Sequence, residues 1–402
     1  MQRGVDSSRG WWNVVAAFVG LGLSYAMFTV FVFGTLVKPL QAEFGWSRAE
    51  MSFALTITNI TVVFGSPALG FLVDRVGVRL LLLPSILLMG IAVAAMSLLQ
   101  GNIWHFYLGF FAITLLGLGT LPLSYSRVLI AWFDKRRGLA LGVALSGFGV
   151  GGALVPEVAA TMTELYGWRS AYQLFAAMVL LVSLPLALLV LREAPAQPEQ
   201  RPDEAEPMKY ELSAAEAVRT HNYWLILASF FLVGIGITSI LSHLVPMLMD
   251  RGMSYQSAAR AMSTLAFALV FGRMLAGYLM DHFFAPYITA VFIVFGLAGG
   301  IAMLALGAVG YQAYIAAALV GLATGSEISE IAYIVGRYFG QLAFGLIYGV
   351  MFGAFQLGSA ISAPLMGYYF DSHGDYIGAL WGVMAVVLVG AVLIARLSPY
   401  PD

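Results

Sequence analysis

The chain has 402 residues, of which 60% are hydrophobic and only 10% are charged, with a net charge of −1 and a mean hydropathy of +0.87. Soluble domains carry about 25% charged residues, so this chain has too little polar surface to be a water-soluble protein. The absence of cysteine excludes disulfides and thiolate metal sites. The net charge gives no indication of nucleic-acid binding, and the composition predicts an all-α integral membrane protein.

A helix that crosses a bilayer needs about 20 apolar residues. Twelve such runs follow one another along the chain. In order, they are residues 12–37, 50–73, 80–99, 104–131, 138–163, 168–191, 222–246, 257–280, 284–307, 311–335, 341–369 and 376–396.

Positive charges are distributed unevenly between the two sides of these spans. Thirteen Lys and Arg residues lie on the side of both termini, five lie on the opposite side, and two, Arg127 and Arg273, fall inside spans. Because Lys and Arg concentrate in cytoplasmic loops, both termini are predicted to be cytoplasmic. The expected location is the cell membrane, meaning the inner or plasma membrane.

A stretch rich in Pro and Glu separates the sixth span from the seventh, and one short surface helix is expected in it near residues 213–219. The predicted domains are a six-helix bundle over 1–191, a cytoplasmic linker over 192–221 and a second six-helix bundle over 222–402. The two bundles match at a constant offset of 207 residues, which pairs Asp74 with Asp281 and Gly138 with Gly345. Two related six-helix halves are typical of secondary transporters, which bind substrate near the membrane midplane.

The loop after the second span reads GFLVDRVGVR, residues 70–79, and a weaker copy, GYLMDHF, follows the eighth span. This loop resembles the G-x-x-x-D-R-x-G-R loop of the major facilitator superfamily, and the resemblance extends over all twelve spans and the linker. It implies a cytoplasmic gate formed by Asp74, Arg75, Arg79 and Asp281. The alternative is a simple cluster of loop charges.

A narrower resemblance rests on WFDKRRGLALGVALSGFGVGG at 132–152, which is similar to a signature of monocarboxylate porters and their bacterial oxalate–formate antiporter relatives. GWWNVVAAF at 10–18, FGWSRAE at 44–50, GRMLAGYLMD at 272–281 and RYFGQLAFGLIYG at 337–349 are similar to the same branch. The glycines of the fifth span also let helices pack closely, whatever the function.

The two arginines within spans are the strongest candidates for substrate binding. Arg273 lies about 12 Å from the membrane face at Asp281, and Arg127 about 10 Å from Asp134, at 1.5 Å per residue. Ionisable groups at such depths usually face a water-filled cavity, and a guanidinium binds a carboxylate through two parallel hydrogen bonds. In the resembled family, the arginine at the position of Arg273 contacts the substrate carboxylate. Snorkelling remains an alternative for Arg127.

The tenth span carries Glu327 and Glu330, which share one helical face. Two neighbouring carboxyls in a medium of low dielectric constant do not easily ionise together, so one of them is expected to carry a proton. The competing interpretation is a fixed salt bridge to Arg127 or Arg273. His243 is a further candidate for proton entry, because histidine exchanges protons near neutral pH.

The sequence departs from the resembled branch in two places. The oxalate–formate branch carries a lysine in the eleventh span, whereas residues 341–369 here contain no Lys or Arg. Many monocarboxylate porters have an acidic residue at the position of Leu269. The remaining candidates for substrate binding are polar residues within spans, namely Tyr25, Thr29, Asn59, Tyr333 and Gln356.

Together these features predict a proton-coupled transporter of a small monocarboxylate such as lactate or pyruvate, working as a monomer by alternating access. The alternative is a carboxylate exchanger of the oxalate–formate kind. No phosphate-binding loop, metal-ligand spacing or catalytic triad is present in the sequence, so no cofactor, metal or enzymatic activity is expected. The predicted partners are a carboxylate, protons and lipid.

Overall fold

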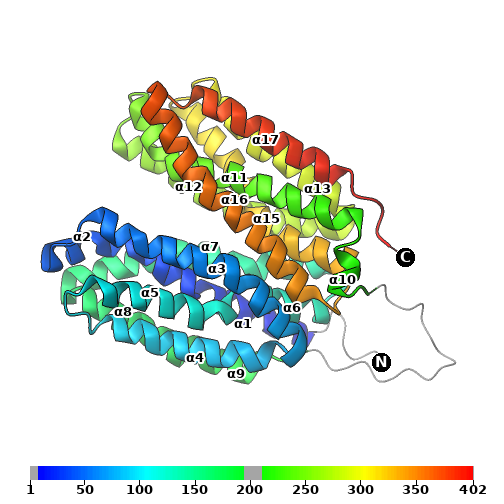
Figure 1. The fold of residues 1–402 in the computed structure, drawn as a ribbon, viewed down its shortest axis with the longest axis horizontal. Helices are drawn as coiled ribbons and strands as arrows, with labels where there is room; N and C mark the ends of the chain where they lie inside the picture. Colours follow the sequence, from blue (N-terminus) through cyan, green and yellow to red (C-terminus); the bar gives the residue numbers. More distant parts are fainter. Residues whose placement is uncertain (1–7, 194–210, 402) are drawn as a thin grey trace. The chain divides into compact units, whose positions relative to one another are not determined.

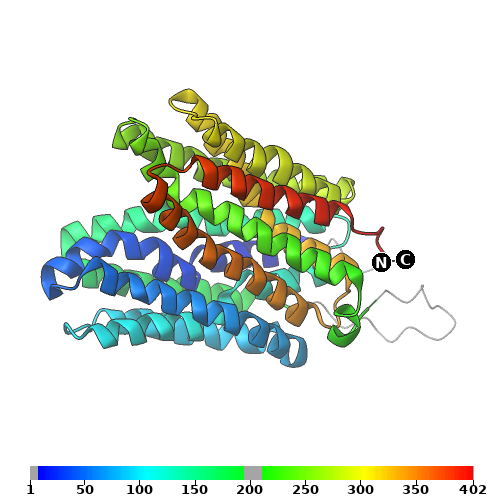
Figure 2. The same cartoon turned by 45° about the horizontal axis from the view of Figure 1, so that its top comes forward.

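The computed structural model describes residues 8–193 and 211–401. Within these ranges, twelve helices are long and apolar enough to cross a membrane, in agreement with the twelve predicted spans. The described residues form helices and connecting loops without β-strands, as the composition predicts. The chain divides into two compact units, and within each unit the helices lie side by side with broadly similar axes (Figures 1 and 2).

The first unit comprises Met1–Lys135, Val143–Lys209 and Ala343–Gly349. Its main helices are α1 (Ser8–Gly22), α2 (Val32–Phe44), α3 (Arg48–Val76), α4 (Val78–Met96), α5 (Ile103–Gly117), α6 (Pro122–Trp132), α7 (Arg137–Tyr166), α8 (Trp168–Met178) and α9 (Leu184–Val190). The π-helices η1 (Met27–Phe31) and η3 (Val179–Ser183) and the 3₁₀ turn η2 (Leu118–Thr120) join some of them.

The second unit comprises Arg136–Gly142, Tyr210–Leu342 and Val350–Asp402. Its main helices are α10 (Ala214–Ala217), α11 (His221–Asp250), α12 (Tyr255–His282), α13 (Ala285–Val291), α14 (Gly299–Ala305), α15 (Tyr311–Tyr338), α16 (Phe344–His373) and α17 (Ile377–Ala395), with the π-helix η5 (Phe292–Ala298) joining α13 to α14. Each unit therefore includes a short segment from the other half of the sequence.

Local sequence explains where several helices begin. Ser47 accepts a hydrogen bond from the backbone N–H of Glu50 while the Glu50 carboxylate accepts one from the N–H of Ser47, so a capping box starts α3. Ser213 and Glu216 start α10 in the same way, and α10 is the short helix expected in the linker. Gly340, which has φ of +75°, allows the chain to turn before α16.

Glycines set the closest helix contacts inside each unit. A Cβ atom at Gly147 of α7 would overlap the carbonyl oxygen of Phe18 on α1. A Cβ atom at Gly325 of α15 would overlap the carbonyl of Leu269 on α12. Small residues thus let these backbones touch, and the contact between α12 and α15 places the side chains of the candidate site.

Candidate functional site

Arg273 is a buried charge of the second unit. It lies on α12, only 2% of it is exposed, and its Nε donates to the carbonyl oxygen of Gly325 on α15 at 2.8 Å. Because a side chain at Gly325 would hold the two helices apart, glycine at this position lets the guanidinium reach the backbone of α15. The Nε bond holds the guanidinium against α15.

Glu327 and Glu330 are buried beside it on α15, with 5% and 2% of each residue exposed. Glu327 is close enough to interact electrostatically with both Arg273 and Glu330. In the described part of the chain, neither glutamate forms a salt bridge, and Glu327 Oε2 and Glu330 Oε1 lack a hydrogen-bond partner. The fixed salt bridge considered from the sequence is therefore not formed in this structure.

Two hydroxyls that the sequence analysis did not select complete this cluster. Ser326 of α15 and Thr289 of α13 approach the Glu330 carboxyl, and both residues are almost fully buried. In the sequence, Thr289 stands out only as a threonine within an apolar span, and such threonines commonly have a purely local role. The Thr hydroxyl usually bonds to its own helix, so sequence alone did not reveal its proximity to Glu330.

Arg127 pairs with an aspartate within the first unit. Its guanidinium on α6 is 3.7 Å from the carboxylate of Asp74 at the end of α3, within the first unit. The side chain is 22% exposed. The structure thus joins Arg127 to the loop that follows the second span, whereas the sequence analysis considered it mainly for substrate binding.

Asp74 and Asp281 make equivalent contacts at the starts of two helices. The Asp74 carboxylate accepts hydrogen bonds from the backbone N–H groups of Gly345 and Leu346, at 2.8 and 2.9 Å, near the start of α16. The Asp281 carboxylate accepts them from Gly138 and Leu139, at 2.6 and 2.9 Å, near the start of α7. A carboxylate is favourable at a helix N-terminus because the N–H groups there lack partners within the helix.

These contacts follow the repeat seen in the sequence. The aspartates are 207 positions apart, and so are the N–H donors of the two helices. Both contacts require glycine on the helix that carries the aspartate. A Cβ atom at Gly70 of α3 would overlap the carbonyl of Gly345, and one at Gly277 of α12 would overlap that of Gly138. The repeat therefore extends from residue types to specific hydrogen bonds.

The other loop candidates have separate partners. The Arg75 guanidinium stacks 4.0 Å from the centroid of the Phe71 ring. The Arg79 guanidinium donates to the carbonyl of Leu188 at 2.7 Å, and its backbone N–H donates to Glu193 at 2.9 Å. Arg79 thus contacts α9 and the segment that follows it.

The remaining polar candidates are distributed over both units. In the first unit, Tyr25 and Thr29 are buried, the Thr29 hydroxyl donates to the Tyr25 carbonyl at 3.1 Å, and Asn59 is exposed. In the second unit, the Tyr333 hydroxyl donates to the Met280 carbonyl at 2.8 Å, and Gln356 is half-buried. Tyr333 therefore lies towards the Asp281 end of α12.

His243 on α11 has two ring contacts. Nδ1 lies 3.3 Å from the Tyr376 hydroxyl, and Nε2 lies 3.0 Å from the Ala363 carbonyl. The carbonyl contact requires a proton on Nε2, which leaves Nδ1 to accept from Tyr376 when the ring is neutral. This histidine is hydrogen-bonded on both sides and is separate from the cluster around Arg273.

Comparison with known proteins places these features in context. Residues 17–325 match the family described as Major Facilitator Superfamily. The chain is 25% identical to human monocarboxylate transporter 11, over 96% of this chain and 83% of that protein. It is 22% identical to the uncharacterized MFS-type transporter YhjX of Escherichia coli strain K12, over 83% of each.

Solved structures show the same fold at lower identity. The transporter FucP in its outward conformation has a TM-score of 0.71 at 17% identity, covering 96% of this chain and 99% of that one. The proton:xylose symporter XylE, bound to 6-bromo-6-deoxy-D-glucose, has a TM-score of 0.74 at 16% identity, covering 98% and 97%. These structures support the fold, and the cluster around Arg273 has to be interpreted from its own chemistry.

Proposed function

Because this chain belongs to the Major Facilitator Superfamily, as its loop motif predicts, we propose that it carries a small monocarboxylate together with a proton by alternating access. The family is one of transporters, and the multi-pass membrane character agrees with it. The observation that carries the finer proposal is the buried cluster of Arg273, Glu327 and Glu330. Similarity to monocarboxylate transporter 11 supports a carboxylate as substrate.

In this proposal Arg273 binds the substrate carboxylate. A planar guanidinium can offer a carboxylate two parallel hydrogen bonds, and the bond from Nε to Gly325 orients the Arg273 side chain. Arginine suits this role because it stays charged in a buried site, whereas a buried lysine readily loses its proton. The other polar candidates, Tyr25, Thr29, Asn59, Tyr333 and Gln356, are proposed to contact the rest of the substrate.

The tenth-span glutamates carry the coupled proton in this mechanism. Glu327 is electrostatically linked to Arg273, so bound carboxylate and ionised Glu327 compete for the same positive charge. Proton uptake by Glu327 or Glu330 relieves that competition and favours the loaded state. Substrate and proton then shift the conformational equilibrium only through their different affinities for its two states.

The proposed cytoplasmic gate consists of Asp74 and Asp281 with their helix starts, and Arg127 joins it through Asp74. We therefore assign Arg127 to the gate rather than to a second carboxylate site. Arg75 stacks on Phe71 beside Asp74 and belongs to the same loop. Both termini are cytoplasmic in this proposal, as the distribution of Lys and Arg predicts.

The test is uptake of labelled lactate, pyruvate and oxalate into proteoliposomes, with and without an inward proton gradient and with and without preloaded anion. Symport predicts accumulation that follows the proton gradient. Uptake that occurs only with preloaded anion would instead establish the exchanger. Transport of none of these anions under any condition would remove the carboxylate proposal.

Variants then connect transport to the cluster. Arg273→Gln is expected to abolish uptake, and Arg273→Lys to lower it strongly, because lysine cannot offer two parallel hydrogen bonds. Arg260→Gln, on the exposed outer part of α12, is the matched control and should transport normally. Normal uptake by Arg273→Gln would contradict the site.

For the proton, at least one of Glu327→Gln and Glu330→Gln is expected to lose gradient-driven accumulation while retaining exchange. Glu157→Gln, an exposed carboxyl on α7, serves as the control. If both cluster variants accumulate substrate normally, the proton is carried elsewhere.

A further inference from the structure

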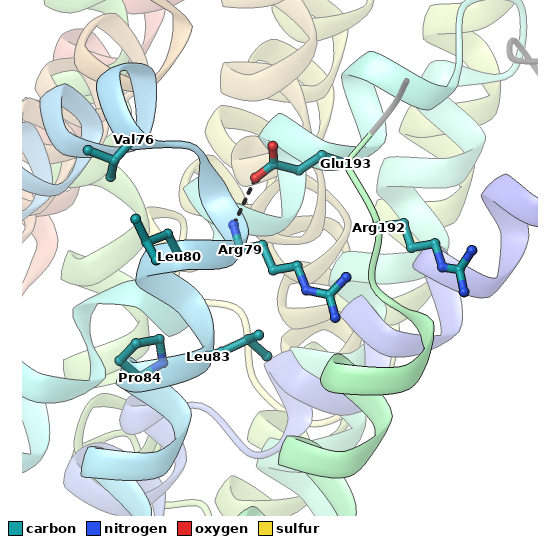
Figure 3. A pocket seen from close by; sticks show the side chains of 7 residues that line it. All are labelled: Val76, Arg79, Leu80, Leu83, Pro84, Arg192 and Glu193. Atoms are coloured by element: carbon teal, nitrogen blue, oxygen red, sulfur yellow. Dashed lines mark hydrogen bonds between the residues drawn. The ribbon is translucent and has the colours of Figure 1, made fainter. Parts of the chain in front are cut away.

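A groove on the first unit shares no lining residue with the proposed transport site. It has a volume of about 840 Å³ and is lined by Val76 at the end of α3, by α4, and by the segment directly after α9 (Figure 3). The lining residues are Val76, Arg79, Leu80, Leu83, Pro84, Arg192 and Glu193. It therefore combines two arginines, one carboxylate and an apolar wall.

The carboxylate in this groove is already engaged by the start of α4. Glu193 Oε1 accepts a hydrogen bond from the backbone N–H of Arg79 at 2.9 Å. Gly77, the residue that precedes α4, offers no side-chain cap, and its lack of a Cβ atom leaves room for the Glu193 carboxylate. Glu193 thus compensates the helix N-terminus, where negative charge is favourable.

The Arg79 guanidinium and the Arg192 backbone are held in place, and neither guanidinium has an acidic partner among the described residues. Arg79 donates to the Leu188 carbonyl at 2.7 Å. The backbone of Arg192 is fixed on both sides, because its N–H donates to Asn13 at 2.8 Å and its carbonyl accepts from the Trp132 indole at 2.7 Å. Among the described residues, neither guanidinium forms an ion pair. The groove thus presents two positive charges for an external anion.

Polar and apolar groups in the groove are ordered along the membrane normal. Arg79 is the second residue of one span, and Arg192 follows directly after another, so both lie at the level of lipid headgroups. Pro84 lies five residues further along α4 than Arg79, about 7.5 Å deeper at 1.5 Å per residue. Leu80, which is 66% exposed, faces the same groove.

We infer that this groove binds an anionic phospholipid, with the phosphate at the Arg79 guanidinium, Arg192 adding positive charge from the neighbouring segment, and an acyl chain along Leu80, Leu83 and Pro84. Arginine forks pair well with phosphate oxygens. The apolar wall below them suits a hydrocarbon chain rather than a soluble anion. In the proposed topology, the lipid belongs to the cytoplasmic leaflet, where anionic headgroups attract basic residues near the membrane surface.

The groove is expected to favour lipids with a net negative charge, because it carries two guanidinium groups and a single carboxylate, Glu193, which already accepts from the Arg79 N–H. A zwitterionic lipid brings an ammonium or choline group as well as its phosphate, and the two guanidinium groups offer that cation no favourable contact. Phosphatidylglycerol is therefore expected to bind more tightly than phosphatidylethanolamine or phosphatidylcholine.

The test is native mass spectrometry of the full chain in detergent, with phosphatidylglycerol, phosphatidylethanolamine and phosphatidylcholine as probes. Each arginine near an anionic surface contributes a factor of about five to binding, so Arg192→Gln should weaken phosphatidylglycerol binding about fivefold. The Arg79→Gln/Arg192→Gln double variant should weaken it about 25-fold. The matched control is Arg219→Gln/Arg396→Gln, which removes two exposed arginines near span ends outside the groove.

Thermal unfolding with inorganic phosphate and with sn-glycerol 3-phosphate separates a lipid from a soluble anion. We expect phosphatidylglycerol to raise Tm and the soluble phosphates to leave it unchanged. Equal effects of lipid and soluble phosphate would overturn the lipid assignment. So would equal retention of the three lipids, or an equal loss of lipid in the control double variant. Arg192→Glu is a further test of lipid binding. It should leave the fold intact, because the Arg192 side chain makes no hydrogen bond in the described structure.

Discussion

Replacing Asp74 with asparagine tests the proposed gate at a single atom. The aspartate carboxylate accepts hydrogen bonds from two backbone N–H groups of α16, Gly345 and Leu346, with one oxygen for each. Asparagine has a single carbonyl oxygen and no charge. Asp74→Asn therefore keeps one of these bonds and loses the other, together with the attraction between the carboxylate and the helix N-terminus.

The contacts indicate the size of the effect. A hydrogen bond to a charged group contributes about 1.5–3 kcal/mol, and the ion pair with Arg127, at 3.7 Å, adds less because both side chains are partly exposed. The carboxylate also loses hydration on burial, which offsets part of this gain. We therefore expect the closed gate to be weakened by about 1.5–3 kcal/mol, equivalent to an increase of about 10- to 150-fold in the open fraction.

The assay uses the absence of native cysteine in this chain. Ser66 on α3 is fully buried, and its hydroxyl donates to the Gly349 carbonyl of α16 at 3.0 Å. A Ser66→Cys reporter should therefore react with a maleimide only when α3 and the start of α16 separate. Adding Asp74→Asn should raise its labelling rate about 10- to 150-fold, and Asp281→Asn should produce a rise of similar size through the related contact.

A second reporter separates gate opening from general loosening. Ser229 on α11 is also fully buried, and it donates to the Gly390 carbonyl at 2.9 Å within the second unit. Ser229→Cys should label at the same slow rate with and without Asp74→Asn. Unchanged labelling of Ser66→Cys in both aspartate variants, or an equal rise at Ser229→Cys, would refute the assignment of these aspartates to the gate.

Three further predictions concern packing, pH and proton entry. Gly147→Ala should lower Tm by overpacking that costs about 1–3 kcal/mol, because its Cβ atom would overlap the Phe18 carbonyl, while Gly34→Ala, with open space around it, should not lower Tm. Hydrogen bonds from Arg169 and Trp168 hold the pKa of Glu43 below its ordinary 4.5. The ionised carboxylate therefore stabilises the fold above that value, and this contribution is lost as pH falls through the lowered pKa. Glu43→Gln should thus lower Tm at pH 7, by an amount equivalent to about 0.2–1 kcal/mol, and the difference from the unmodified chain should shrink as the pH falls below 4.5 through the lowered pKa. A difference that persists at low pH would contradict the ionic origin. His243→Gln should slow proton-driven uptake and leave exchange intact, which the proteoliposome assay measures directly. Normal proton-driven uptake would exclude His243 from proton entry.

The sequence determined those features that depend on composition and local pattern. Twelve apolar runs of sufficient length predicted the spans. This prediction needs no knowledge of packing, because residues that face lipid must be apolar whichever helices lie beside them. The constant offset of 207 residues predicted related halves and paired Asp74 with Asp281 before any contact was known. Arg273 was recognisable as a candidate because a lone charge in an apolar run is costly to bury.

Only the tertiary structure decided which groups meet. Arg127 and Arg273 were both candidates for substrate binding in the sequence, but helix packing places one beside Asp74 and the other against Gly325. The groove at Arg79 and Arg192 joins residues 113 positions apart and has no local signature. Hydropathy and helical periodicity indicate whether a residue faces lipid or neighbouring helices. The choice of partner depends on where neighbouring helices approach one another, which glycine contacts between distant segments determine.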